Sequence, residues 1–469
     1  MKKLAIAAAV IAVIAIAASQ LFNPADLVGS TQKRNDALIE EQLAYHYGVT
    51  AYLYGYPLVD MHKQMHNETH RVSADQNTYA PVNRFFRFPN LVEPETSGNF
   101  RAPNNDTLYY TAWFDISEQP LIIHTPDTAG RYFTIAVTNL YAEVSHIGRR
   151  TTGTEEGYFA LVPPHWQGEL PDGVVAIPTE TNKGWLLGRM LVDGADDFDA
   201  AMGLVEDVWA ASLDEFTMGQ RPPLPAEKSA QAIDPLDNID FFTVMNRELK
   251  TLPARPGEAA LMAMFDQIGV GPGQQFDPAA LSEAARKGLE RAIVDGQAIV
   301  AAGSARTIPD FNGWMISKHI GRYGYKYMHR AAVVKGGYGN LPEESLYPAA
   351  LTDNEDQLLH GSNTYQLHFA ADQMPPVDGF WSLSLYTLGD SLLAPNELRR
   401  YSIGDRTRDL HYNDDGSLVI TLSHARPDST QANWLPAPEG YFVAVMRLYE
   451  PSEAALDNSY QLPRIRIVK

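Results

Sequence analysis

Residues 131–138 alternate between apolar and polar side chains, which places Phe133, Ile135 and Val137 on one face. A period of two is typical of a half-buried β-strand. Turn-forming residues interrupt the surrounding stretch every few positions, at Pro120, Pro126, Gly130, Gly148, Pro163, Pro164, Gly168, Pro171, Gly173 and Pro178. Many short strands separated by frequent turns favour a β-sandwich or jelly roll over residues 80–190.

The same β pattern returns in the last third of the chain. Tyr365, Leu367 and Phe369 alternate with polar neighbours, and the turn signal at 413–416 precedes a predicted strand over 418–423. A last strand is predicted over 441–449. Two strand-rich regions therefore flank the middle of the chain.

Helical periodicity occupies the remaining segments. Before the first β region we expect one helix over 33–53 and a second over 58–71, because Gly55 and Pro57 interrupt the pattern. Further helices are predicted within 196–213, 239–249, 258–268 and 277–303, the last beginning at Asp277-Pro278.

These patterns predict an α+β fold, mainly β. It has two β-sandwich or jelly-roll-like modules, with a helical middle section and N-terminal helices. The expected boundaries are 1–19 for a signal peptide, 33–200 for the N-terminal helices and first β module, 201–330 for the helical section and 331–469 for the second β module. The proline-rich stretch Arg221–Pro235 is predicted to be an exposed linker.

The N-terminus has the layout of a secretory signal. Lys2 and Lys3 precede the unbroken apolar run Leu4–Ala18, and Ala17 and Ser19 supply small residues for cleavage after position 19. We therefore expect a periplasmic or secreted protein. The alternative is an uncleaved membrane anchor, although the apolar run is shorter than the roughly 17–25 residues of a spanning helix.

Composition excludes several functions. The 57 acidic and 37 basic residues give a net charge of −20, which repels phosphate backbones and disfavours nucleic-acid partners and anionic membrane surfaces. The absence of cysteine excludes disulfides, thiolate nucleophiles and zinc–thiolate sites. The chain has no Gly-x-Ser-x-Gly elbow, phosphate-binding loop or dinucleotide fingerprint.

The densest polar cluster lies at 101–110, where a loop rich in Asn and Asp leads into a predicted strand. Loops at strand ends often carry the side chains of a pocket. Candidate binding residues are Arg101, Asn104, Asn105 and Thr107, and candidate acid–base residues are Asp106 and Tyr109. The alternative is a purely structural turn in which Asn and Asp cap the backbone and Arg101 pairs with Asp106.

Further candidates are scattered. His368 is a third acid–base candidate, and the candidate binding residues elsewhere are Tyr141, Trp314, Trp381, Arg399 and Trp434. Aromatic side chains with neighbouring cations can line a pocket, and Arg399 could hold a carboxylate. The same aromatic residues could equally belong to the core, and Arg399 could be a surface cation.

Three histidines share one helical stripe at His62, His66 and His70. Two histidines four residues apart can share a metal ion, but the third is displaced by about 80° around the helix. We therefore interpret the stripe as a polar face and predict no metal ligands there.

Several motifs, in the same order, resemble a bacterial two-module family of unknown function. Arg101-Ala-Pro-Asn-Asn-Asp-Thr-Leu-Tyr109 and Gly130-Arg-Tyr-Phe-Thr134 are similar to its N-terminal domain of unknown function, number twelve fifty-four. The segments 381–386, 400–407, 412–417 and 433–438 are similar to its C-terminal domain of unknown function, number twelve fourteen. The resemblance implies two β-sandwich-like modules with a helical section between them.

Three functional hypotheses follow. The first is an exported enzyme of hydrolase or lyase type that acts on a small molecule. The second is a non-catalytic periplasmic binder of small molecules or glycans, and the third is an envelope interaction protein. The sequence identifies no cofactor, substrate or oligomeric state.

Overall fold

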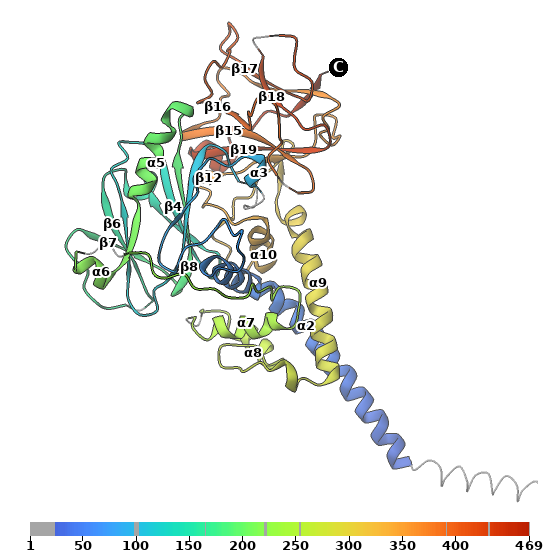
Figure 1. Cartoon of the computed structure of the whole chain (residues 1–469). Coiled ribbons are helices and arrows are strands. Elements are labelled where there is room, and N and C mark those ends of the chain that lie inside the picture. The colour runs from blue at the N-terminus through green and yellow to red at the C-terminus, as the bar shows by residue number, and fades with distance from the viewer. Residues whose placement is uncertain are drawn as a thin grey trace, which may run out of the picture.

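The computed structural model describes residues 24–97, 103–164, 166–219, 223–252, 255–390, 392–429 and 432–468. The fold is α+β and mainly β, as predicted. Two strand-rich parts lie against each other, and helices gather at one end of the first (Figure 1). The helices are α2 (Pro24–Thr69), α3 (Pro94–Ser97), α4 (Arg149–Thr152), α5 (Phe198–Asp207), α6 (Leu213–Thr217), α7 (Asp240–Leu249), α8 (Ala259–Asp266), α9 (Glu283–Thr307), α10 (Tyr327–Gly336) and α11 (Glu453–Asp457), with 3-10 turns η1 (Ala195–Asp197) and η2 (Pro278–Ala280).

The N-terminal strands form a two-layer sandwich. One sheet has the order β1-β2-β8-β4-β5 and the other β7-β6-β3-β9. Their bounds are β1 (Phe86–Arg87), β2 (Thr107–Asp115), β3 (Leu121–Thr125), β4 (Phe133–Asn139), β5 (Val144–Gly148), β6 (Gly157–Val162), β7 (Val174–Pro178), β8 (Lys183–Leu191) and β9 (Trp209–Ser212). Leu108 and Phe114 of β2 share one buried core with Leu121 and Ile123 of β3, so this core joins the two sheets.

The C-terminal strands form a second sandwich. One sheet has the order β10-β11-β13-β19-β15-β16, with β12 also paired to β19, and the other has the order β18-β17-β14-β20. Their bounds are β10 (Asp310–Phe311), β11 (Trp314–Met315), β12 (Ser345–Leu346), β13 (Ala349–Ala350), β14 (Thr364–Phe369), β15 (Val377–Thr387), β16 (Ser402–Gly404), β17 (Leu418–Ser423), β18 (Asn433–Pro436), β19 (Phe442–Pro451) and β20 (Arg466–Val468). Leu367, Leu383, Ile420 and Met446 meet in its core.

The two helices predicted over 33–53 and 58–71 are one continuous helix in the structure. Helix α2 continues through Gly55 and Pro57 to Thr69. A Cβ at Gly55 would collide with the side chain of Met245 on α7, and one at Gly48 would collide with Ala292 on α9. The glycines therefore allow close helix packing, and burial of the surrounding face offsets the cost of an internal proline.

Two other sequence predictions need correction. The segment 196–213 was expected to be one helix, but α5 ends at Asp207 and Trp209–Ser212 pairs with β3 as β9. The strand at 131–138 was expected to be half-buried, but all of β4 is buried. Its second face is covered by other parts of the molecule. Apolar and polar side chains therefore still alternate along β4, although neither face of the strand is exposed to solvent.

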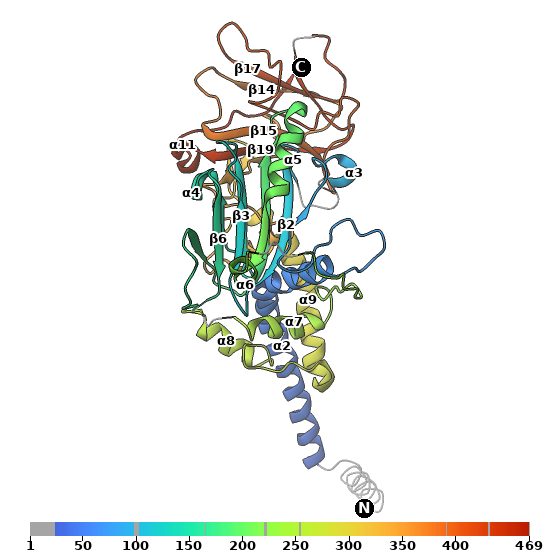
Figure 2. The same cartoon turned by 60° about the vertical axis from the view of Figure 1, so that its left-hand side comes forward.

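The linker prediction is supported in one respect. Residues 223–229 are exposed. The segment also runs along the end of α2, because Arg71 bridges Ser229 and Lys63 pairs with Asp234. Turning the molecule by 60° shows α2 and α9 side by side below the sandwiches, with α2 extending beyond α9 (Figure 2).

The predicted signal segment 1–19 lies outside the described residues. Among the helices that are described, none is both long and apolar enough to cross a membrane.

Candidate functional site

A cavity of about 340 Å³ lies between the two sandwiches. One face of the β2–β8 pair forms a wall: Tyr109, Thr111, Trp113, Trp185, Leu187 and Arg189. The alternate residues of the same strands, such as Leu108 and Leu186, point into the N-terminal core. Strand alternation therefore assigns one face to the core and the other to the cavity.

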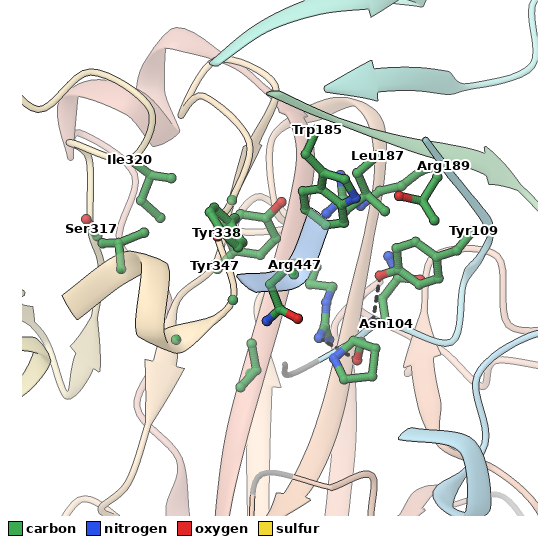
Figure 3. Close-up of a pocket in the computed structure, with 18 of the residues that line it drawn as sticks. Asn104, Tyr109, Trp185, Leu187, Arg189, Ser317, Ile320, Tyr338, Tyr347 and Arg447 are labelled. Atoms are coloured by element: carbon green, nitrogen blue, oxygen red, sulfur yellow. Dashed lines mark hydrogen bonds between the residues drawn. The ribbon is translucent and has the colours of Figure 1, made fainter. Parts of the chain in front are cut away.

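The C-terminal domain supplies a second wall through β19. Val445, Arg447 and Tyr449 line the cavity, while Ala444 and Met446 face the C-terminal core. Helix α10 and the glycine-rich segment 336–339 contribute a third side. In Figure 3, Trp185, Leu187 and Arg189 follow one another along β8, and Tyr338 lies on the side of the strand that faces Ser317 and Ile320.

Arg189 is the most unusual group in this wall, because it is 7% exposed and carries a charge. Its Nη1 donates to Asn340 Oδ1 at 2.8 Å, and its guanidinium lies 5.5 Å from the centroid of the Tyr109 ring. Within the described part of the chain, no carboxylate forms an ion pair with Arg189, and its Nε has no hydrogen-bond partner. A buried charge of this kind is costly unless an anion reaches it.

Arg447 places a second guanidinium on the adjoining wall. It is 2% exposed, and its Nη2 donates to the carbonyl oxygen of Pro103 at 3.0 Å and to Tyr386 Oη. Burial opposes the charge of both arginines, but the neighbouring phenolic groups raise the guanidinium pKa of Arg189 and of Arg447 above the ordinary value. Both side chains are therefore cationic at neutral pH.

Tyrosine hydroxyls surround the two cations. Burial raises the pKa of Tyr449 well above its ordinary value, so this phenol keeps its proton and can donate a hydrogen bond. The hydroxyl of Tyr109 accepts from the backbone N–H of Asn104 at 3.1 Å. This end of the cavity therefore offers cations and hydroxyls, the groups that bind carboxylate, sulfonate or phosphate.

The opposite end of the β2–β8 wall is aromatic. The rings of Trp113 and Trp185 stack with centroids 5.9 Å apart, and Tyr338 lies 5.4 Å from Trp185. Trp113 Nε1 donates to Glu68 Oε2 at 2.7 Å. Glu68, near the C-terminal end of α2, also lines the cavity.

The described part of the predicted loop at 101–110 reaches this cavity through Pro103, Asn104 and Tyr109. Asn104 Oδ1 accepts from the backbone N–H groups of Asp106 and Thr107, both at 3.0 Å. Its Nδ2 donates to Tyr449 Oη at 2.6 Å. Asn104 therefore shapes the loop and ties it to the C-terminal domain.

The other predicted residues of this loop point elsewhere. Thr107 Oγ1 donates to Asn104 Oδ1, and Asn105 Nδ2 donates to the carbonyl oxygen of Val92. Arg101 lies outside the described residues.

Asp106 is buried in a polar cluster away from the cavity lining. Its carboxylate accepts from Ser382 Oγ at 2.6 Å, Ser402 Oγ at 3.2 Å and Arg406 Nη2 at 3.2 Å. Asp106 comes from the N-terminal domain and all three donors come from the C-terminal domain. The charge partner in the structure is therefore Arg406.

The remaining candidates are dispersed. Tyr141 packs in the helical core against Arg255, Trp314 and Trp381 belong to the C-terminal core, and Trp434 donates to the carbonyl oxygen of Ser423. Arg399 pairs with Glu93, and His368 is exposed on β14. The structure does not bring these six residues together with the loop at 101–110 in the cavity.

The three histidines, two on α2 and His70 directly after it, contact different partners. His62 Nδ1 lies 2.7 Å from Glu248 Oε1, and His66 Nε2 lies 3.0 Å from the carbonyl oxygen of Gln231. The rings of His66 and His70 stack at 4.7 Å. Burial opposes the charge of Glu248, but hydrogen bonds from His62 and Lys183 lower its pKa.

Sequence reasoning missed Arg189, Arg447, Trp113 and Trp185. A signal was available, because Arg189 and Arg447 each interrupt a run of apolar residues within a strand. An arginine at a buried strand position needs a partner or a ligand.

Fold and cavity together define a two-domain β-sandwich protein with a pocket between its domains. Residues 82–210 match the family described as "Protein of unknown function (DUF1254)", and residues 344–453 match "Protein of unknown function (DUF1214)". The chain belongs to the family in which these two domains occur in this order, as the sequence motifs indicated.

The chain is similar to the VPA0106 protein from Vibrio parahaemolyticus, whose crystal structure aligns over 91% of this chain and 100% of its own. The identity is 25% and the TM-score 0.68. A putative uncharacterized protein from Burkholderia cenocepacia aligns over 94% of this chain and 97% of its own, at 14% identity and a TM-score of 0.44. No curated protein matches the sequence.

Proposed function

We propose that this protein binds a small organic anion in the cavity between its two domains. The observation that carries the proposal is Arg189, a buried cation on the cavity wall that no described carboxylate neutralises. Arg447 adds a second cation beside it, and the stacked pair Trp113 and Trp185 provides an apolar surface. An arylalkanoate, with a carboxylate joined to an aromatic ring, has both complementary features.

Calorimetry with a series from benzoate to 5-phenylpentanoate tests this binding. At least one member should bind, and its neutral amide should bind at least tenfold more weakly. Arg189→Gln should remove most of the difference between acid and amide. Arg399→Gln, which removes an exposed arginine that pairs with Glu93 outside the cavity, should leave binding unchanged and serves as the matched control.

Two results would contradict the proposal. One is that no acid of the series binds at millimolar concentration. The other is that the acid binds equally well to the wild-type protein and to Arg189→Gln, in which case the cation does not recognise the anion.

A hydrolase or lyase reaction is the second candidate. It is favoured by one observation, that Glu68 and Tyr109 both line the cavity and can exchange protons with a bound molecule. Of the earlier acid–base candidates, Tyr109 is at the cavity, whereas Asp106 and His368 are not. Incubation with amides and esters of the best-binding acid tests this candidate, because product formation that is lost in Glu68→Gln would support it.

We further propose that residues 1–19 direct export, so that the protein acts in the periplasm or outside the cell. Lys2, Lys3, the apolar run Leu4–Ala18 and Ser19 support this. N-terminal sequencing of protein from the periplasmic fraction should begin after residue 19. An intact Met1 in the cytoplasmic fraction would contradict it.

A further inference from the structure

A carboxylate, Glu68, lies at the same cavity as the two arginines. It is half-buried near the C-terminal end of α2 and accepts the indole N–H of Trp113 through Oε2 at 2.7 Å. Gln64, one turn earlier on α2, also lines the cavity. The cavity therefore has groups of opposite charge in its wall.

The two charged regions are separated along the strands. Tyr109 pairs in register with Arg189, and Trp113 pairs with Trp185. Four residues along a β-strand span about 13 Å, at about 3.3 Å per residue. The anion-binding end at Arg189 and the Glu68 end, next to Trp113, are therefore far enough apart for one elongated molecule to contact both.

The Glu68 end of the wall is aromatic, and Thr111 and Leu187 lie between it and Arg189. Trp113 and Trp185 stack with an interplanar angle of 27°, and Tyr338 faces Trp185. Indole and phenol faces attract cations as well as flat apolar groups. A positively charged group that reached Glu68 would thus meet both a carboxylate and aromatic rings.

We infer that the ligand is an amphoteric molecule, with an anionic group at Arg189 and Arg447 and, toward the Glu68 end, a flat unsaturated group against the tryptophans and a protonated amine at Glu68. This rests on the proposed function, because it adds the amine end to the anion already assigned to the arginines. Glu68 is then a specificity-determining residue that favours ligands with an amine over simple arylalkanoates.

The test compares three probes that share one skeleton. They are 3-phenylpropanoate, 3-[4-(aminomethyl)phenyl]propanoate and 3-[4-(hydroxymethyl)phenyl]propanoate, measured by calorimetry at pH 7. The wild-type protein should bind the aminomethyl compound at least tenfold more tightly than the other two. The hydroxymethyl compound matches the amine in size and hydrogen bonding, so the comparison isolates the charge and needs no variant.

Glu68→Gln should remove this preference while the affinity for 3-phenylpropanoate stays within about twofold. Glutamine keeps a carbonyl oxygen that can accept the Trp113 N–H, so a purely positional role of Glu68 would leave the preference intact. Gln64→Glu, one turn away on the same side of α2, should instead strengthen binding of the aminomethyl compound.

The outcomes separate this inference from the proposed function. Equal affinities for the three probes in the wild-type protein, or a preference that survives in Glu68→Gln, would overturn the amine site. The anion site would still stand if binding of 3-phenylpropanoate required Arg189. Failure of all three probes to bind would overturn the amine site on this skeleton, whereas the anion site is overturned only if no acid from benzoate to 5-phenylpentanoate binds.

Discussion

Asp106 offers a direct test of how the two domains are held together. The structure places its carboxylate between Ser382, Ser402 and Arg406 of the C-terminal domain, with 6% of the residue exposed. Asp106→Asn keeps the size of the side chain but removes its charge and replaces one acceptor oxygen by a donor. The guanidinium of Arg406 then loses its hydrogen-bonded carboxylate and keeps only the more distant Asp405, 3.8 Å from its Nε, while it remains largely buried.

The expected loss follows from these contacts. Removing a charge-assisted hydrogen bond in a buried site costs about 1–3 kcal/mol. The upper part of this range applies, because the Arg406 side chain is only 19% exposed and water replaces the lost partner poorly. At roughly 2–4 °C per kcal/mol for domains of this size, a loss of about 2–3 kcal/mol should lower the melting temperature by about 4–12 °C.

Thermal unfolding of Asp106→Asn and of Arg399→Gln decides the matter. The pair between Arg399 and Glu93 is 65% and 35% exposed, so its removal should cost less than about 1 kcal/mol. Arylalkanoate binding should persist in Asp106→Asn, because Asp106 does not line the cavity. Loss of binding at an unchanged melting temperature would refute this reasoning and make Asp106 a site residue, as the sequence had suggested.

Three other predictions concern separate regions. Burial raises the pKa of Asp405 to about 6. An acid with a raised pKa holds its proton more tightly in the folded state, so the contribution of this carboxyl to stability falls as the pH rises from about 4 to about 6. The unfolding midpoint of the wild-type protein relative to that of Asp405→Asn should therefore decrease across this range, and a constant difference would contradict the prediction. Limited proteolysis should cut first within Arg221–Pro235, and first cuts within Phe133–Val137 would contradict the domain boundaries. His66→Ala should leave the metal content of the purified protein unchanged, and a stoichiometric ion lost on this substitution would contradict the prediction.

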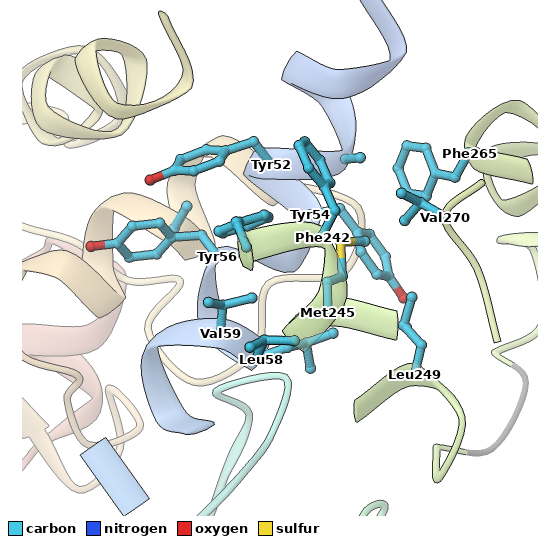
Figure 4. Packing of buried hydrophobic residues seen from close by; sticks show 14 of the residues in the cluster. Tyr52, Tyr54, Tyr56, Leu58, Val59, Phe242, Met245, Leu249, Phe265 and Val270 are labelled. Carbon is cyan, nitrogen blue, oxygen red and sulfur yellow. The ribbon is translucent and has the colours of Figure 1, made fainter. Parts of the chain in front are cut away.

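Local sequence patterns predicted the strands well, because the alternation of apolar and polar residues along a strand can be recognised from a few neighbouring positions. The strands at 364–369 and 418–423 are β14 and β17, with the predicted bounds. The pattern failed where tertiary contacts decide the outcome. Gly55 and Pro57 were interpreted as a helix end, but in Figure 4 this part of α2 packs through Tyr54, Tyr56 and Leu58 in the cluster that includes Phe242 and Met245 of α7.

The site was predictable only in part, and for the same reason. The composition of the loop at 101–110 marked Asn104 and Tyr109, which do line the cavity. Arg189 on β8 and Arg447 on β19 line the same cavity although they belong to different domains, an arrangement that depends on how both domains fold. Sequence distance suggested Arg101 as the partner of Asp106, and Arg101 lies outside the described residues; Arg406, 300 positions away, is a partner that sequence distance could not suggest.

The loop that opens β2 connects the cavity and the domain interface. The carbonyl oxygen of Pro103 accepts from Tyr386 and Arg447, Asn104 donates to Tyr449, and Asp106 accepts from the serine pair and Arg406. Each of these partners belongs to the C-terminal domain, and Arg447 and Tyr449 also line the cavity. A shift between the domains would therefore change the position of Arg447 relative to Arg189. Because an anion held by both arginines favours only the arrangement in which they converge, its binding should also stabilise the association of the two domains.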